Sequence, residues 1–373
     1  MSSSPEQQSL DSHNATDFDA DIVVYKYHYE VHIIAAVLIS GAILGSIGNC
    51  FVIIAVALSK KLQTATNVFV VNLAVADVTT CLFTPWQAVA ILGGDEWPIP
   101  RAPWLCTASA FVVVTTIGCS INNLALIAIN RWVGITKSRF TTHRICTSRK
   151  LALMVIFAWA VPLCCALIPV VTDVGELGYE KLYKSCTWVR SNPYSSYYST
   201  FVTAINYPIQ LFAIVVSYTS IFCYVRKTSQ KMARADAPSI SDKVSGGVSS
   251  RAMRKKLWKR QLDVTKNLLY IVLAFVFCLS PYFVSIISSA VWSYRLAPWG
   301  AVVLFCNSSV NPIIYATSHP DFKVAFKHML RCQNMPVERN GRYRSTGNTS
   351  LKTWRVVQQM PRTAPLSGPE AGH

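Results

Sequence analysis

Seven strongly apolar segments follow one another along the chain, separated by polar loops. They run roughly over residues 31–58, 66–92, 104–135, 150–171, 197–225, 264–291 and 296–317. About 20 apolar residues cross the hydrocarbon core of a bilayer as a helix, which pairs every backbone polar group internally. A soluble helical bundle would show polar stripes at every turn, and these segments mostly lack them. The pattern therefore predicts an all-α membrane protein with a seven-transmembrane helix bundle.

The chain divides into four parts. We expect an extracellular N-terminal tail over 1–30, the seven-transmembrane bundle over 31–317, a short amphipathic eighth helix over 318–332 and a flexible cytoplasmic tail over 333–373. The composition agrees, because 52% of the 373 residues are hydrophobic and only 14% are charged. One membrane domain accounts for nearly the whole chain.

The net charge of +17 could suggest a nucleic-acid partner, but its distribution indicates a membrane instead. Basic residues gather in alternate loops, above all between Arg226 and Gln261, whereas acids dominate the first 30 residues. Cytoplasmic loops carry the excess of Lys and Arg in membrane proteins. We therefore expect a multi-pass protein of the plasma membrane, with its N-terminus outside, its C-terminus in the cytoplasm and no nucleic-acid partner.

Two residues in the tails are candidates for modification. Asn14 begins an Asn-Ala-Thr acceptor for glycosylation on the expected outer side. Cys332 follows the amphipathic stretch, where palmitoylation would anchor an interfacial helix; the alternative is an ordinary free thiol.

Most of the twelve cysteines stand singly inside spans, where a thiol behaves as a small hydrophobic group. Cys106 and Cys186 differ, because one begins the third span and the other lies in the second external loop. Both face the oxidising side of the membrane. We predict a disulfide between them that stabilises the fold by about 2–4 kcal/mol.

Charged residues inside a span are costly unless they face the bundle interior. Asp77 lies in the middle of the second span and Arg131 ends the third. Arg131 could act inside the bundle or extend to the interface. Asp77 is either a protonated core acid or part of a sodium site, since sodium prefers hard oxygen ligands. The candidate sodium ligands are Asp77, Ser120, Asn307, Ser308 and Asn311.

A set of landmarks recurs along the spans in a fixed order. They are Gly48-Asn49, the segment from Asn72 to Asp77, Cys106, Asn130-Arg131-Trp132, Trp159, Pro169, Pro281 and Asn311-Pro312-Ile313-Ile314-Tyr315. Through them, residues 30–332 resemble the rhodopsin-like (class A) G-protein-coupled receptors. Asn130 and the segment 264–268 are also similar to the melatonin-like, medium-chain-fatty-acid-like, moody and trapped-in-endoderm receptors.

This resemblance implies a ligand-operated switch without covalent chemistry. Pro281 kinks its helix, so a contact at the outer end can move the inner end. The resemblance assigns heterotrimeric G proteins as partners, and an arrestin-type protein after phosphorylation. The residues that it implies for the switch and for G-protein coupling are Asn130, Arg131, Trp132, Tyr218, Pro281, Asn311, Pro312 and Tyr315.

The chain departs from the family pattern at several of these positions. Asn130 replaces the acid that usually precedes the arginine, and Trp132 replaces a tyrosine. Leu279 replaces the tryptophan that usually stands between Cys278 and Pro281. We expect these changes to alter basal activity.

The absence of an acidic residue at one position of the third span argues against a biogenic-amine ligand. Val113, seven residues after Cys106, stands where biogenic-amine receptors carry Asp, so we expect a neutral or lipid-like small molecule. Arg190 could meet a carboxylate, or it could be a solvated loop residue. A peptide ligand is the alternative within the same fold. The candidate pocket residues are Val113, Thr116, Arg190, Leu279 and Tyr282.

Two other function classes are disfavoured. A transporter should show internal repeats and broken helices in matching halves, and the sequence has no visible repeat. An intramembrane enzyme needs paired acids, a nucleophile or metal ligands, and all seven histidines lie outside the span cores. We therefore expect no enzymatic activity and no cofactor other than sodium as an allosteric modulator.

Overall fold

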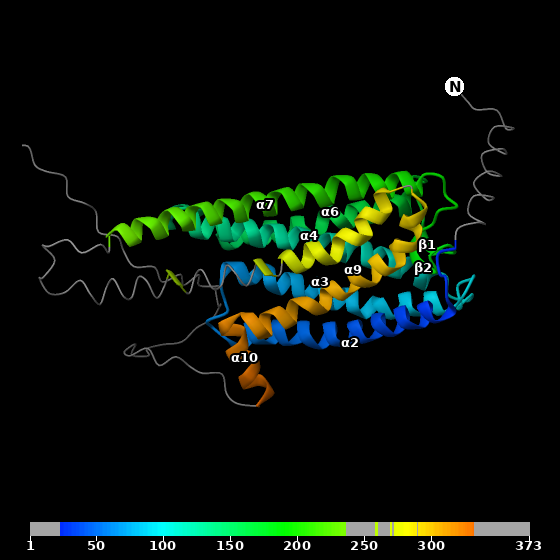
Figure 1. Cartoon of the computed structure of the whole chain (residues 1–373), viewed down its shortest axis with the longest axis horizontal. Coiled ribbons are helices and arrows are strands. Elements are labelled where there is room, and N and C mark those ends of the chain that lie inside the picture. Colours follow the sequence, from blue (N-terminus) through cyan, green and yellow to red (C-terminus); the bar gives the residue numbers. More distant parts are fainter. Residues whose placement is uncertain (1–22, 236–257, 260–268, 271, 289, 332–373) are drawn as a thin grey trace, which may run out of the picture.

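The computed structural model describes residues 23–235, 258, 259, 269, 270, 272–288 and 290–331. Within these residues, six helices are long and apolar enough to cross a membrane, and Val272–Ile287 is a shorter apolar helix in the predicted sixth span. The six are α2 (His28–Leu58), α3 (Ala65–Leu92), α4 (Trp104–Thr136), α6 (Ser148–Val171), α7 (Ser195–Ala235) and α9 (Val291–Ser318). Figure 1 shows them running side by side along the longest axis. The predicted seven-helix bundle is confirmed.

The observed helices match most of the apolar segments within a few residues. The boundary between the last two spans was predicted wrongly, because the sixth-span helix ends at Ile287 and α9 already begins at Val291, five residues before the predicted 296. Two further helix ends also differ. The first helix begins at His28, inside the predicted tail, and Val24 just before it is already buried. The fifth helix, α7, continues past residue 225 to Ala235. Its last ten residues are largely polar, so hydropathy alone would end this helix too early.

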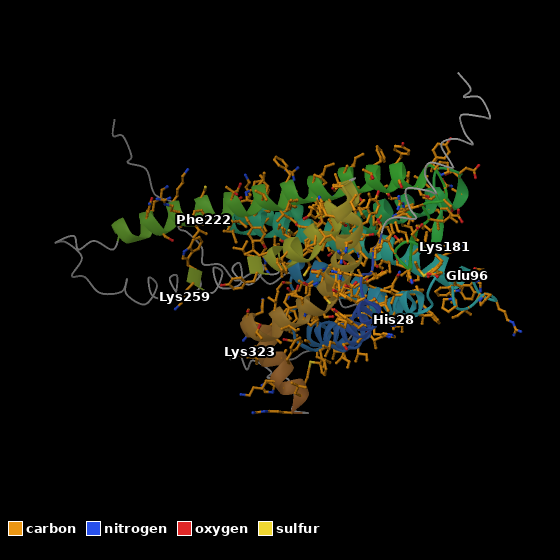
Figure 2. All side chains as sticks on the ribbon, turned by 45° about the vertical axis from the view of Figure 1, so that its right-hand side comes forward. His28, Glu96, Lys181, Phe222, Lys259 and Lys323 are labelled. Carbon is orange, nitrogen blue, oxygen red and sulfur yellow. A yellow bond between two sulfur atoms is a disulfide. The ribbon has the colours of Figure 1, made fainter. Side chains whose placement is uncertain are left out.

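Three short elements in the loops were not predicted. They are α5 (Arg139–Ile145), β1 (Leu177–Glu180) and β2 (Ser185–Trp188). The two strands pair antiparallel, with Tyr179 opposite Cys186. In Figure 1 they lie at one end of the bundle, while α10 (Pro320–Leu330) lies at the other. Figure 2 likewise places Glu96 and Lys181 at the strand end, and Lys259 and Lys323 toward the opposite end.

The predicted amphipathic eighth helix is α10. Proline stands in its first turn, with Asp321 beside it and Lys327 in the last turn, which suits the helix dipole. Its apolar face packs on the bundle, since Phe322 and Ala325 are buried. The eighth helix is therefore held against α2 and α9 by its side chains.

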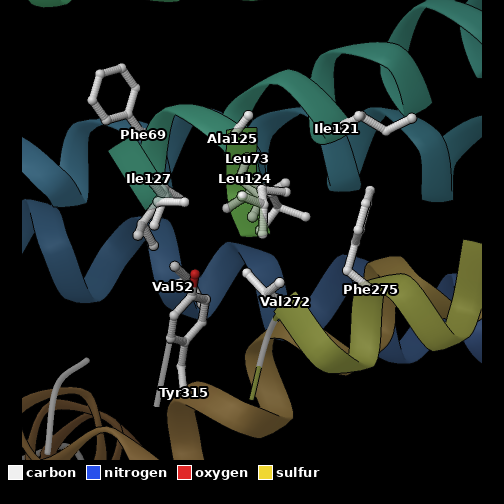
Figure 3. Close-up of a cluster of buried hydrophobic side chains, with 14 of the residues drawn as sticks. Val52, Phe69, Leu73, Ile121, Leu124, Ala125, Ile127, Val272, Phe275 and Tyr315 are labelled. Carbon is white, nitrogen blue, oxygen red and sulfur yellow. The ribbon is translucent and has the colours of Figure 1, made fainter. Parts of the chain in front are cut away.

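Helix α4 lies at the centre of the bundle and packs against α3, α6 and α7. The largest cluster of buried apolar side chains in the described residues surrounds the second half of α4 (Figure 3). The members labelled in that figure are Val52, Phe69, Leu73, Ile121, Leu124, Ala125, Ile127, Val272, Phe275 and Tyr315. The labelled side chains alone come from five helices, so this core fixes how those helices are rotated relative to one another.

Glycine allows α9 to lie very close to the sixth span. A Cβ atom at Gly300 would lie 2.8 Å from the backbone nitrogen of Tyr282 and 3.1 Å from the carbonyl carbon of Pro281. Backbone atoms cannot move aside as a flexible side chain can. The contact therefore needs glycine, as do close helix crossings in other membrane proteins.

We expect Gly300→Ala to destabilise the purified protein by about 1–3 kcal/mol, the usual cost of overpacking. Gly41→Ala is the matched control, because Gly41 also faces α9 but its Cβ would meet nothing closer than 3.7 Å. Thermal unfolding in detergent should show a lower melting temperature for the first variant only. Equal melting temperatures would contradict the close crossing.

Candidate functional site

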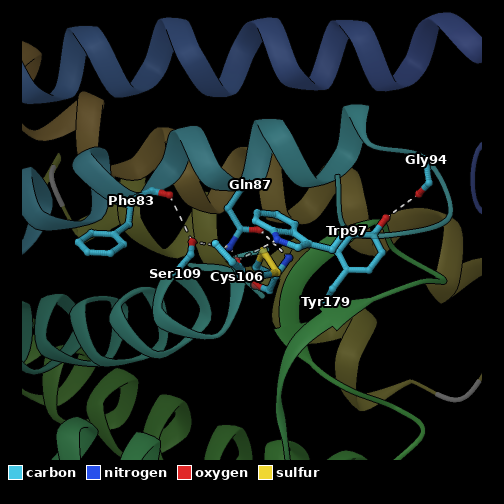
Figure 4. Close-up of a disulfide and its surroundings, with 9 residues drawn as sticks. Phe83, Gln87, Gly94, Trp97, Cys106, Ser109 and Tyr179 are labelled. Atoms are coloured by element: carbon cyan, nitrogen blue, oxygen red, sulfur yellow. Dashed lines mark hydrogen bonds between the residues drawn. A yellow bond between two sulfur atoms is a disulfide. The ribbon is translucent and has the colours of Figure 1, made fainter. Parts of the chain in front are cut away.

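A disulfide joins Cys106 at the start of α4 to Cys186 in β2, with Cα atoms 5.1 Å apart (Figure 4). The predicted pairing is confirmed. Gln87 of α3 supports the same strand, since its side-chain amide donates to the Cys186 carbonyl at 2.8 Å and accepts from the Cys186 nitrogen at 3.0 Å. Figure 4 shows Gln87 beside the disulfide. The strand is therefore fixed to both α3 and α4.

Further contacts hold the β-hairpin over its end of the bundle. The Tyr179 hydroxyl donates to the Gly94 carbonyl at 2.5 Å, and burial raises the pKa of Tyr179 to about 12. The Tyr25 hydroxyl donates to the Tyr183 carbonyl at 2.6 Å. Residues before α2 and residues of the hairpin thus meet above the helices.

A cavity of about 720 Å³ lies beneath this cover. Its wall includes apolar side chains from all seven spans, among them Val113 and Ile117 of α4, Phe283 of the sixth span and Leu304 of α9. Hydroxyl groups from α7 and from the sixth span add polar points. A cavity of this size suits a small molecule, because ligand sites usually measure about 300–1,000 Å³.

Two cationic side chains, Lys184 and Arg190, are the only charged residues among the described residues that line the cavity. The Lys184 ammonium pairs with Asp95 at 3.2 Å. The Arg190 guanidinium lies over the ring of Tyr294, 5.1 Å from its centroid. Since the lining contains no carboxylate, nothing in it would neutralise a ligand ammonium group.

Three of the five predicted pocket residues, Val113, Arg190 and Tyr282, line this cavity. Thr116 and Leu279 do not. Thr116 turns toward α3, where its hydroxyl accepts from Thr80 at 2.8 Å. Leu279 is fully buried in the core cluster below the cavity. Both predictions need correction, because sequence spacing places a residue on a span but does not fix how that span is rotated.

Asp77 lies in the middle of α3 and is 1% exposed. Its carboxylate accepts hydrogen bonds from Ser120 at 3.3 Å, from Ser308 at 3.1 Å and from Asn311 at 2.8 Å. The structure thus brings together four of the five predicted sodium ligands, from three helices. Asn307 is not among the partners of Asp77, and its side-chain oxygen is buried without a hydrogen-bond partner in the described residues.

The end of the bundle opposite the hairpin, near α10, gathers Arg131, Tyr218 and Tyr315. Arg131 lies within electrostatic reach of both phenols. The Nε atom of Arg131 and both hydroxyl oxygens are buried, and none has a hydrogen-bond partner in the part of the chain that the structure describes. Buried polar atoms usually have partners, so these three groups are placed to bind a polar group that reaches them.

Asn130 and Trp132, which flank this arginine, contact the loop that follows. The Asn130 side chain accepts from the Thr66 hydroxyl at 3.3 Å and lies 3.8 Å from the Cys146 sulfur. Trp132 stacks under the Lys137 ammonium, which is 5.0 Å from its ring. The asparagine thus joins α4 to α3 and to the end of α5 without any charge.

The two prolines predicted for the switch lie inside helices. Pro281 is in the turn of Val272–Ile287 that meets Gly300, and Pro312 is in α9 beside Gly48 of α2. Asn14 and Cys332 lie outside the described residues, so both modifications stay predictions.

Gln87, Tyr25 and Trp188 were missed by sequence reasoning. A signal existed only for Gln87, which is a polar residue inside an apolar span. Tyr25 and Trp188 are ordinary aromatic residues near the membrane surface, and only the fold brings them to the cavity.

The sequence was also compared with known proteins. The family model "7 transmembrane receptor (rhodopsin family)" matches residues 48–315. The alpha-1D adrenergic receptor of Sus scrofa is 30% identical over 77% of this chain and 54% of its own length. The melatonin receptor type 1B of Rattus norvegicus is 30% identical over 76% of this chain and 74% of its own length.

An allatostatin-A receptor of Bombyx mori is 28% identical over 78% of this chain and 77% of its own length. Squid rhodopsin has the same fold, with a TM-score of 0.65, 20% identity and coverage of 85% of this chain and 93% of that one. The chain spans about half the length of the adrenergic receptors that it matches. These relatives are named for different ligands, so the similarity does not select a ligand class.

Proposed function

The chain belongs to the rhodopsin family of seven-transmembrane receptors, which are receptors rather than enzymes. We propose that it binds a neutral or lipid-like small molecule and activates heterotrimeric G proteins. The observation that carries the ligand class is the wall of the 720 Å³ cavity, which is apolar and aromatic with hydroxyl groups and has no acid among its described residues. Val113 occupies the position where an amine-binding acid would stand. Arg190 offers a guanidinium to an acceptor group on the ligand.

A ligand screen by thermal stabilisation tests this ligand class, because a compound that binds only the folded protein raises its melting temperature. We expect stabilisation by neutral or lipid-like compounds and none by simple amines. Val113→Trp should abolish it by filling the cavity, whereas Val112→Trp should not, because Val112 does not line the cavity. Stabilisation by amines would contradict the proposal.

A peptide is the alternative ligand, and it would have to displace the contact between Tyr25 and Tyr183.

The proposed orientation places the N-terminus outside the plasma membrane and the C-terminus in the cytoplasm. It is supported by the disulfide at one end of the bundle and by Lys259 and Lys323, from the basic third loop and eighth helix, at the other. In this orientation Arg131, Tyr218 and Tyr315 face the G protein, and a phosphorylated cytoplasmic tail would recruit an arrestin-type protein.

We also propose that Asp77 holds a sodium ion that favours the resting state. The donor set fits, because a buried carboxylate and two hydroxyl oxygens are hard oxygen ligands, and the amide of Asn311, whose nitrogen donates to Asp77, carries one more oxygen. An ion shared by α3, α4 and α9 would stabilise the packing of these helices. An agonist that prefers another packing would then bind more weakly in sodium.

We expect sodium to lower agonist affinity by about fivefold or more in the wild-type protein, and Asp77→Asn to remove this dependence. The substitution keeps the shape of the side chain and removes its charge. Agonist titrations in sodium and in an equal concentration of a bulky organic cation separate a specific site from screening. If the wild type binds equally in both salts, or the variant keeps the full difference, Asp77 is a packing acid only.

A further inference from the structure

The cavity extends sideways to the boundary between α6 and α7. Pro162 and Cys165 of α6 line it together with Val202 and Asn206 of α7. In the described residues the backbones of these two helices approach each other at very few points at most, whereas α4 packs closely against each of them. We call this boundary the α6–α7 seam. It is closed by side chains rather than by helix packing.

Among the described residues, two polar side-chain contacts bridge the seam. The Tyr198 hydroxyl donates to the Cys165 carbonyl at 2.9 Å, and Asn206 contacts the Cys165 thiol. Below them, a Cβ at Gly118 would lie 2.5 Å from Pro162, so α4 and α6 touch there and close the lower edge. Cys165 lies six residues before the end of α6, which is about 9 Å along a helix. The seam is therefore at the depth of the outer lipid leaflet.

Two side chains that line the cavity are also turned outward from the bundle. Tyr197 is 79% exposed and Phe201 is 60% exposed, both on α7. In a bilayer these rings face lipid, so the wall of the cavity is continuous with the lipid-facing surface. The mouth toward water is covered differently, by the contact between Tyr25 and Tyr183 and by the hairpin that the disulfide holds in place.

We propose that the cavity opens to the bilayer through the α6–α7 seam, and that its ligand is an amphiphile with an apolar chain, which enters from the outer leaflet. This inference rests on the proposed ligand class and orientation. The seam has uncharged walls, with Pro162, Cys165 and Val202 beside the hydroxyl groups and the Asn206 amide of α7, and the hydrogen bond that crosses it is breakable. These features suit the passage of a hydrocarbon chain, whereas a strongly hydrated ligand would have to pass the covered mouth.

The test uses the full-length chain in lipid nanodiscs that contain a single-chain fatty alcohol with a diazirine group and an alkyne tag. After brief illumination, mass spectrometry locates the cross-linked residues. We expect adducts on the inner wall, at Val114, Ile117 and Ile121, besides those on lipid-facing side chains such as Phe212. Cys165→Trp, which fills the seam, should remove the inner adducts and leave those on Phe212.

Two matched controls make the result specific. Cys164→Trp places the same ring one residue away, on the exposed face of α6 outside the cavity, and should keep the inner adducts. Tyr25→Phe, which releases the mouth, should leave their rate unchanged. Tyr198→Phe keeps the ring and removes the bridging hydrogen bond, so it should speed inner labelling about fivefold, the factor for one ordinary hydrogen bond.

No inner adducts in the wild type would overturn the proposal. The proposal would also be overturned if Cys165→Trp left the inner labelling intact or if Tyr25→Phe accelerated it. An unchanged rate of inner labelling in Tyr198→Phe would overturn it as well. Tyr198→Phe preserves side-chain volume, so its labelling rate decides the question even if the larger substitution fails to fold. Because labelling requires no nucleotide exchange, failure here would remove the lateral entry route and leave receptor function to be tested separately.

Discussion

Arg131→Ala is expected to abolish ligand-driven nucleotide exchange on the G protein while leaving surface expression largely intact. The guanidinium lies beside Tyr218 and Tyr315 at the inner end of the bundle, where buried polar atoms of all three residues have no hydrogen-bond partner in the described structure. A rearrangement that satisfies these atoms needs the cationic group. Exchange measured on membranes with matched receptor levels tests this role.

Arg226→Ala is the control for loss of charge, because Arg226 is exposed on the inner part of α7 and should affect exchange only weakly. Arg131→Lys should recover only part of the activity, since an ammonium group lacks the planar arrangement of donors of a guanidinium. Unchanged exchange in Arg131→Ala at equal surface level would refute the role of this residue.

The second large effect concerns the disulfide. Removing Cys106 or Cys186 should each cost about 2–4 kcal/mol of stability and should impair ligand binding, because the hairpin over the cavity loses its covalent link to α4. Removing both should cost no more than removing one, since a single bond is lost in every case. Surface expression and thermal unfolding of Cys106→Ser, Cys186→Ser and the double variant provide the comparison.

Cys164→Ser is the matched control, because Cys164 is an exposed free thiol and its loss should have little effect. If the double variant were much less stable than either single variant, the two cysteines would contribute independently and the pairing would not explain the stability.

The spans and the disulfide could be predicted because each rests on a one-dimensional property. An apolar run of sufficient length has one stable form in lipid, whatever its neighbours are. Cys106 and Cys186 were distinguished by their positions relative to the spans. The polar cluster around Asp77 followed from the cost of burying a charge, which requires polar partners somewhere in the bundle.

The details of the cavity depend on three-dimensional packing. Thr116 and Leu279 were assigned to the pocket by spacing, but helix rotation directs one toward α3 and buries the other in the core. The strands β1 and β2 have only four residues each, and they are fixed by the disulfide and by Gln87 rather than by their own sequence. Tyr25 reaches Tyr183 across 158 residues of chain, a contact that no local pattern encodes.

The central claim is that a ligand in the cavity controls a G protein at the inner face. The most direct test is nucleotide exchange by several purified G-protein families, with the full-length receptor in nanodiscs and the compounds found by thermal stabilisation. We predict that at least one neutral or lipid-like compound accelerates exchange, and that Val113→Trp removes this effect while Val112→Trp retains it. The claim would be contradicted by compounds that bind in the cavity and change nucleotide exchange on none of the G-protein families. It would also be contradicted if the protein carried such compounds across a sealed membrane.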